Sequence, residues 1–141
     1  MKTILDHFHE VSLVAVIEDE LGLRCEVSPM IVDSRRNVVE DSTQKIQLVD
    51  FGLVSGYLVV PEIVQIGLDI KYSDNFVISE VSDNTLLNYF GFDVFGQAKR
   101  HFVIRTSHQY VNVFVDADSS EGMEKLIVVC NLENYGLSDP A

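Results

Sequence analysis

The alternation of apolar and polar side chains is clearest in residues 101–116, HFVIRTSHQYVNVFVD. This stretch predicts two antiparallel strands joined by a two-residue loop at Ser107 and His108. The register pairs Ile104 with Val111 and Phe102 with Val113 on one face, and Arg105 with Tyr110 and Val103 with Asn112 on the other. One face is apolar and the other mixed, so we expect one face on a core. The loop lacks the Asn-Gly or Gly-x that favours two-residue turns, so a longer loop stays open.

Residues 3–21 predict an N-terminal helix. Thr3 and Asp6 have the spacing of a capping box, with Asp in place of the usual Glu or Gln. Apolar side chains then recur at helical spacing as far as Leu21, and Gly22 follows where a helix commonly ends. The competing interpretation is a buried strand over residues 11–17, which their β-branched side chains favour.

The middle of the chain predicts mostly strands. We expect them at residues 23–32, interrupted or ended by Pro29, at 45–60 with bends at Gly52 and Gly56, at 63–72 and at 76–81. Residues 33–43 are polar and predict a loop. A short helix is expected from Ser82 to Phe90, closed by Gly91.

A C-terminal helix is predicted over residues 118–136. Acidic residues begin it, Met123, Leu126 and Cys130 share one helical face, and Gly136 stands where it would end. The run Ile127-Val128-Val129 favours a strand instead. The fold class expected is α+β, a single globular domain over residues 1–141 that is mainly antiparallel β-sheet with an N-terminal helix and a C-terminal helix.

Charge changes the picture of what the chain could bind. Its 22 acidic and 10 basic residues give a net charge of −12 and a pI near 4.5. Such a field repels nucleic acid and anionic membranes and steers basic proteins toward the surface. The alternative is that the acidity only maintains solubility.

Cysteine usage and the start of the chain bear on its compartment. Cys25 and Cys130 are far apart and lack CxxC spacing, so neither a disulfide framework nor a structural zinc site is expected. Lys2 is not followed by a long apolar run, so no signal peptide is predicted. The apolar run at residues 13–17 is too short to cross a membrane. We expect a cytoplasmic protein.

Histidines are the first candidates for metal binding. His7 and His9, with Glu10 beside them, would point about 200° apart on a helix and could not share an ion. On a strand they could, with His101 or His108 as a third ligand. We favour surface histidines at a helix start and predict no metal and no cofactor.

Signatures of catalysis are absent from the sequence. It has no GxSxG elbow, no glycine-rich phosphate loop and no recognisable cysteine nucleophile. Ser107 and His108 are adjacent in a turn, where a nucleophile and its base rarely pair. Asp116, Asp118 and Glu121 do not have EF-hand spacing. We therefore predict no enzyme and no catalytic residues.

Aromatic residues are a possible contact surface. Tyr89, Phe90, Phe92 and Phe95 lie close together in the sequence. Such a group is more often core, but an exposed member would be a credible anchor for a protein partner.

Size, acidity and element pattern are shared with two broad groups of proteins. One comprises small immunity proteins that neutralise bacterial toxins, often basic nucleases; the other comprises acidic export chaperones. Because fold does not fix function, these are analogies. We predict a non-catalytic inhibitor or immunity protein that holds a basic protein partner. A chaperone for an extended client segment is the alternative, and a small hydrolase is a third.

Helix electrostatics selects the candidate partner-binding residues. Glu18, Asp19 and Glu20 would occupy the last turn of the N-terminal helix, where the dipole disfavours negative charge. A cluster that lowers stability is a better functional candidate than one that raises it. Glu26, Glu40 and Asp41 are weaker candidates. Asp116, Asp118, Glu121 and Glu124 are explained by their place at a helix start.

Overall fold

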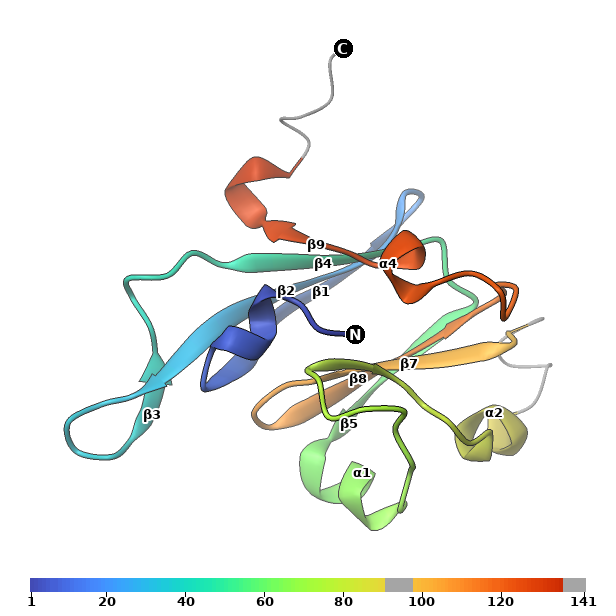
Figure 1. Cartoon of the computed structure of the whole chain (residues 1–141), viewed down its shortest axis with the longest axis horizontal. Coiled ribbons are helices and arrows are strands. Elements are labelled where there is room, and N and C mark those ends of the chain that lie inside the picture. The colour runs from blue at the N-terminus through green and yellow to red at the C-terminus, as the bar shows by residue number, and fades with distance from the viewer. Residues whose placement is uncertain (91–97, 136–141) are drawn as a thin grey trace.

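The computed structural model describes residues 1–90 and 98–135 and shows two antiparallel sheets with a few short helices (Figure 1). Sheet A has the order β1 (Glu10–Asp19), β2 (Gly22–Val32), β4 (Gln47–Gly52) and β9 (Val128–Asn131), and β3 (Val38–Glu40) also pairs with β2. Sheet B has the order β5 (Gly56–Pro61), β8 (Gln109–Val115), β7 (Arg100–Arg105) and β6 (Ile78–Glu80). The predicted mainly antiparallel β architecture is confirmed.

The two sheets share one hydrophobic core. Each strand sends alternate side chains inward, so the two inner faces meet as a layer of apolar residues. Sheet A contributes Val11, Leu23, Cys25, Val27 and Val49, and sheet B contributes Phe102, Ile104, Val111 and Val113. The short 3-10 helix η1 (Ile4–His7) adds Leu5, whose side chain is fully buried.

The predicted register of the β7–β8 hairpin is confirmed at all four pairs, with Ser107 and His108 at the turn. The expectation of a single core face is wrong. Val103 and Asn112, on the mixed face, are as buried as Ile104 and Val111 on the apolar face. The hairpin is therefore covered on both sides.

The second cover consists of α1 (Glu62–Gly67), the residues that follow it as far as Tyr72, and α2 (Thr85–Phe90); Figure 1 shows both helices in its lower part. They enclose a second apolar cluster made of Ile70, Val81, Leu86, Ala98, Val103 and Phe114. The strand predicted at residues 63–72 is wrong, because α1 turns Gln65 inward and leaves Ile63 and Ile66 exposed. The helix predicted before residue 90 is confirmed for α2, where an Asp83 carboxylate oxygen accepts from the Thr85 N–H at 3.1 Å.

The predicted N-terminal helix is wrong beyond its first turn. The capping box exists: Thr3 Oγ1 accepts from the Leu5 N–H at 3.1 Å, and Asp6 accepts from the Thr3 N–H at 2.8 Å. However, η1 ends at His7, and residues 10–19 form β1. Local capping is satisfied by a single turn, whereas the β-branched residues after it gain a ladder of pairs with β2. The strand alternative is confirmed.

The predicted C-terminal helix is also wrong over most of its length. α4 (Met123–Leu126) has 4 residues and is followed by β9 and the 3-10 helix η2 (Leu132–Asn134). Val128 and Val129 pair with β4 and complete sheet A. The predicted stops Gly91 and Gly136, and the aromatic residues Phe92 and Phe95, lie outside the described residues. In the described ranges no helix has the length and apolar character needed to cross a membrane.

Candidate protein-binding surface

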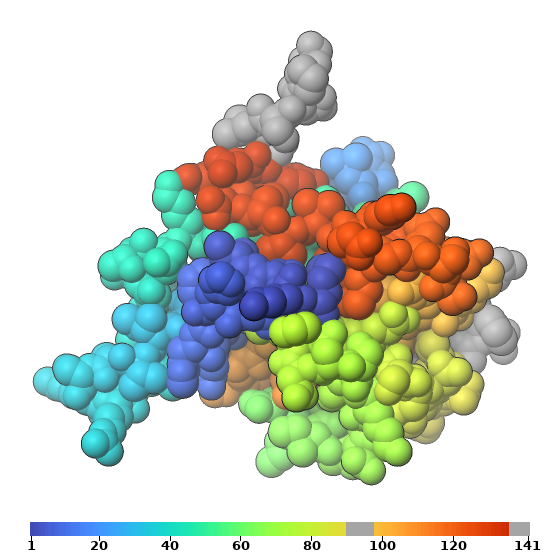
Figure 2. Space-filling model, in the orientation of Figure 1, coloured from blue at the N-terminus to red at the C-terminus, as the bar shows by residue number. Residues whose placement is uncertain are grey.

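Glu18, Asp19 and Glu20 lie at the end of the β1–β2 hairpin, not at the end of a helix. β1 ends at Asp19 and β2 begins at Gly22, so Glu20 and Leu21 form the turn. An Asp19 carboxylate oxygen accepts from the Leu21 N–H at 2.9 Å. The turn stands clear at the upper edge of the molecule in Figure 2. Because no helix ends here, the dipole argument that selected these residues is wrong, although their exposed position still makes them candidates.

Asp19 has a structural partner. Arg24 donates to its two carboxylate oxygens at 3.0 and 2.7 Å. These hydrogen bonds hold the pKa of the Asp19 carboxyl down at about 2. Glu18 and Glu20 form no ion pair with any residue that the structure describes. Of the three acidic residues, Glu18 and Glu20 are thus the two with carboxylates available to a partner.

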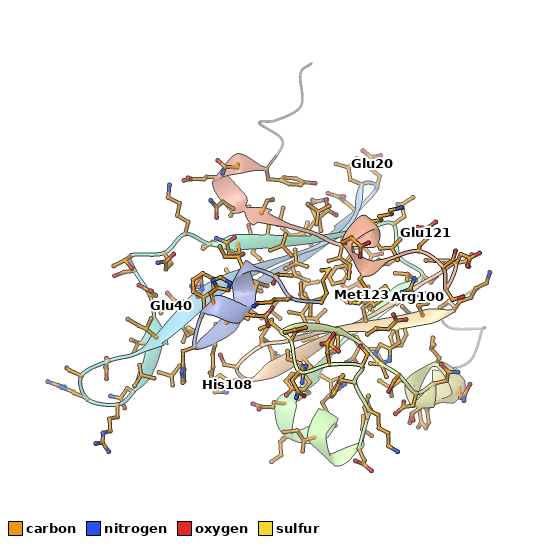
Figure 3. All side chains as sticks on the ribbon, viewed as in Figure 1. Glu20, Glu40, Arg100, His108, Glu121 and Met123 are labelled. Carbon is orange, nitrogen blue, oxygen red and sulfur yellow. The ribbon has the colours of Figure 1, made fainter. Side chains whose placement is uncertain are left out.

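The weaker candidates divide between two regions. Glu26 lies on β2 opposite Ala15 of β1, half-buried on the outer face of sheet A. Glu40 pairs with Met30, which lies eight positions along β2 from Gly22. At about 3.3 Å per residue, this places Glu40 about 26 Å from the β1–β2 turn. Figure 3 shows Glu20 and Glu40 far apart.

Asp41 also has a local role. Its carboxylate accepts from the Thr43 N–H at 3.0 Å and from the Thr43 hydroxyl at 2.6 Å, and its own N–H donates to the Pro29 carbonyl. This is the geometry of a side chain that stabilises a turn. Glu18 and Glu20 therefore lie at one end of sheet A, and Glu40 and Asp41 lie toward the other. Glu26 lies between them, four positions along β2 from Gly22 and four from Met30.

Three arginines direct their charge into the protein. Arg100 donates to both Glu80 carboxylate oxygens at 2.9 and 2.8 Å and to the carbonyl oxygens of Asp118 and Glu121. Arg105 donates to the carbonyl of Phe76 and lies 4.7 Å above the Tyr72 ring. Arg24 is paired with Asp19, as described above. Of the ten basic residues, these three are engaged by other protein groups and add no free positive charge to the surface.

A polar network is buried beneath sheet B. Gln65 and Asn112 exchange two amide hydrogen bonds of 2.9 Å, and Gln65 also donates to the Tyr72 hydroxyl at 3.2 Å. His101 Nε2 lies 2.7 Å from Asn112 Oδ1. Because that oxygen can only accept, Nε2 carries the ring proton. These residues were not singled out as a group from the sequence. The available signal was that His101, Asn112 and Gln65 are polar residues within otherwise apolar segments.

The other ring nitrogen of His101 has no hydrogen-bond partner among the described residues. The ring is buried and stacks on Phe114, with 4.6 Å between ring centroids. Burial lowers the pKa of His101 from 6.5 to about 4, so the imidazole is neutral at physiological pH. The network contains no nucleophile paired with a base, and its physical effect is to fix α1 on the sheet.

A cleft of about 410 Å³ opens at one end of the space between the sheets, near the β7–β8 turn. His9, Glu10, Glu62, His108 and Tyr110 are among its lining residues. Ser107, also in the lining, donates its hydroxyl to the Val11 carbonyl at 3.1 Å, so it is not paired with a histidine. Of the four histidines, the cleft brings His9 and His108 together; His7 and His101 do not line it. In the described part of the chain no group of three His, Cys, Asp or Glu residues is placed to hold a metal ion.

The geometry thus offers an acidic end of sheet A, a buried polar network and a mixed cleft. Comparison of the chain with protein-family models, with curated proteins and with solved structures found no match. The case for a function therefore depends on the surface itself.

Proposed function

We propose that the chain is a non-catalytic acidic binding protein, of the inhibitor or immunity type, that holds a basic protein partner such as a nuclease toxin. The supporting observation is the distribution of charge. Arg24, Arg100 and Arg105 are engaged within the protein, while Glu18 and Glu20 project from the β1–β2 turn without a cation. A basic partner would supply the missing positive charge.

The net charge of −12 supports the same proposal through association kinetics. A field of this sign speeds the encounter with a cationic protein and opposes the approach of nucleic acid and anionic lipid. The compartment proposed is the cytoplasm, since Cys25 and Cys130 are both free thiols.

A chaperone that binds an extended client segment is the second candidate function. It is favoured by one observation, the long edge of sheet A formed by β1. Strand addition to a sheet edge is a common way to hold an extended peptide.

The proposal is tested by capture from the source cell at about 50 mM and about 500 mM salt, followed by binding measurements with the purified captured protein. The test variant is Glu18→Lys with Glu20→Lys, which leaves the Asp19–Arg24 pair intact. The control is Glu121→Lys with Glu124→Lys, two exposed positions outside the turn that change the net charge equally. We expect the test variant to slow association by about tenfold at low salt and the control to slow it much less.

Binding that does not weaken with salt, or a captured partner that is not basic, would contradict the proposal. Equal slowing by the two double variants would show that the overall field acts and that the β1–β2 turn is not the contact. Circular dichroism on both variants establishes that each is folded.

A further inference from the structure

β1 is a long strand with one open side. It has 10 residues and lies at the end of the strand order of sheet A. The strands at the other sheet ends have 4 residues in β9, 6 in β5 and 3 in β6. Within residues 1–90 and 98–135 no strand pairs with β1 on the side away from β2. Long free edges are templates for pairing with another chain, and proteins usually shorten or charge them.

The composition of β1 does not protect its edge. Residues 11–17 are seven consecutive uncharged residues, VSLVAVI, between Glu10 and Glu18. One β-bulge lies between Leu13 and Ala15, and Val14 within it is 47% exposed. Beyond the bulge, residues 15–19 pair with β2 without interruption. Edges of this composition, without lysine or proline, are suited to strand addition.

The open stretch has a defined start. The Ser107 N–H donates to the Val11 carbonyl at 2.8 Å, and the Ser107 hydroxyl donates to the same oxygen. The β7–β8 turn therefore occupies the edge at Val11. The stretch left for another strand runs over residues 13–19, which at about 3.4 Å per residue is about 24 Å. A strand of ordinary length fits this space.

A second copy of the chain is a poor occupant. An antiparallel pair of β1 strands centred on Val14 would place Glu10 opposite Glu18 of the second copy. A pair centred on Val16 would place Glu18 opposite Val14 and Asp19 opposite Leu13. The first register sets like charges opposite one another, which destabilises a sheet, and the second leaves Glu18 and Asp19 without an opposite charge. The edge is therefore matched to a strand of different composition.

We infer that residues 13–19 of β1 accept an extended segment of a basic protein as an added strand of sheet A. The segment is uncharged where it lies along residues 13–17 and carries lysine or arginine beside Glu18 and Glu20. Glu26, opposite Ala15 on the neighbouring strand, adds negative charge on the outer face. This inference depends on the proposed function, because it specifies how the basic partner is held.

The test uses a synthetic peptide, acetyl-Lys-Thr-Val-Thr-Val-Thr-Lys-amide with a fluorescent label, and measures binding by anisotropy. Three further peptides are compared with it. One has glutamate in place of both lysines. The other two carry backbone N-methyl groups on alternate residues, one on the odd positions and one on the even positions. We expect the lysine peptide to bind, the glutamate peptide to bind at least about tenfold more weakly, and one N-methyl phase to lose binding.

Matched variants identify the edge. Val14→Lys adds a charge on β1, and Val128→Lys adds the same charge at the opposite edge of the same sheet, where Val128 is 55% exposed. We expect Val14→Lys to weaken the lysine peptide by at least about tenfold and Val128→Lys to change its affinity less than about threefold. Hydrogen exchange should slow at amides of residues 13–19 when the peptide is bound.

Three results would overturn the inference: no binding of the lysine peptide, equal binding of the glutamate peptide, or loss of binding in Val128→Lys alone. A homodimer that Val14→Lys dissociates would assign the edge to a second copy instead. Failure of this inference can be told apart from failure of the proposed function. If a basic partner binds in a salt-dependent way and Val14→Lys leaves that binding unchanged, the β1 edge is excluded as the binding site while the proposed function stands.

Discussion

Acid should destabilise this protein through His101. The imidazole is buried, and its Nδ1 has no hydrogen-bond partner within residues 1–90 and 98–135. Burial lowers its pKa from 6.5 in the unfolded chain to about 4 in the folded protein. Between these values the unfolded chain binds a proton that the folded protein does not. Lowering the pH from 6.5 toward 4 therefore favours unfolding. The free energy of unfolding has its full value, as far as His101 is concerned, only above pH 6.5.

The magnitude follows from the two pKa values. At about 1.36 kcal/mol per unit, the full loss is about 3 kcal/mol, and about 2 kcal/mol of it is reached by pH 5. Natural domains have a free energy of unfolding of about 5–15 kcal/mol, so this loss is large enough to measure. The carboxyl of Asp19, with a pKa of about 2, loses its contribution only at lower pH, outside this window.

The assay is urea unfolding at pH about 7.5 and about 5, followed by circular dichroism. His101→Gln keeps an N–H donor for Asn112 but does not titrate, and His108→Gln is the control at the exposed turn. We expect the wild type and His108→Gln to lose about 2 kcal/mol more than His101→Gln over this interval. An equal loss in His101→Gln would refute the reasoning, because the titrating group would then lie elsewhere.

Two further predictions concern the packing. Gly22 has a φ of +117°, and a Cβ there would lie 2.1 Å from the Gly52 carbonyl oxygen, so Gly22→Ala should destabilise by roughly 2–4 kcal/mol in thermal unfolding. Gly67→Ala, with no atom within 4 Å of the added methyl group, should stay within about 0.5 kcal/mol of wild type; equal effects of the two would contradict the close approach. Val113→Asp should prevent folding, and Asn112→Asp, which removes the donor to Gln65, should lower the free energy of urea unfolding by about 1–3 kcal/mol. A folded Val113→Asp protein would show that this side chain does not lie in the core.

The register of the β7–β8 hairpin could be predicted because its information is local. Apolar and polar residues alternate on both sides of a short turn, and only one register keeps Phe102, Ile104 and Val111 on the same face. What lies on the other face was not predictable in this way. The burial of Asn112 depends on α1, which the alternation around Ile63 had indicated to be a strand.

The two terminal segments show a different limit. In residues 3–21 apolar side chains fit a helical period, while Val and Ile favour a strand, so sequence alone leaves both open. Pairing with β2 decides the outcome, and that pairing is a tertiary interaction. The candidate acidic residues could be named from the sequence, but their division into two regions depends on β2 running between them.

The strand order of sheet A has a consequence for the route of folding. Sheet B is assembled from residues 56–115, all of which precede β9 in the chain. In contrast, β4 can pair with β9 only after residues 128–131 have been made, because Gln47 pairs with Asn131, 84 positions later. Contacts of such long sequence separation form late, because the intervening chain must first be ordered. During synthesis, sheet B can therefore be complete while β4 still exposes an unpaired edge, which β9 covers once it has been made.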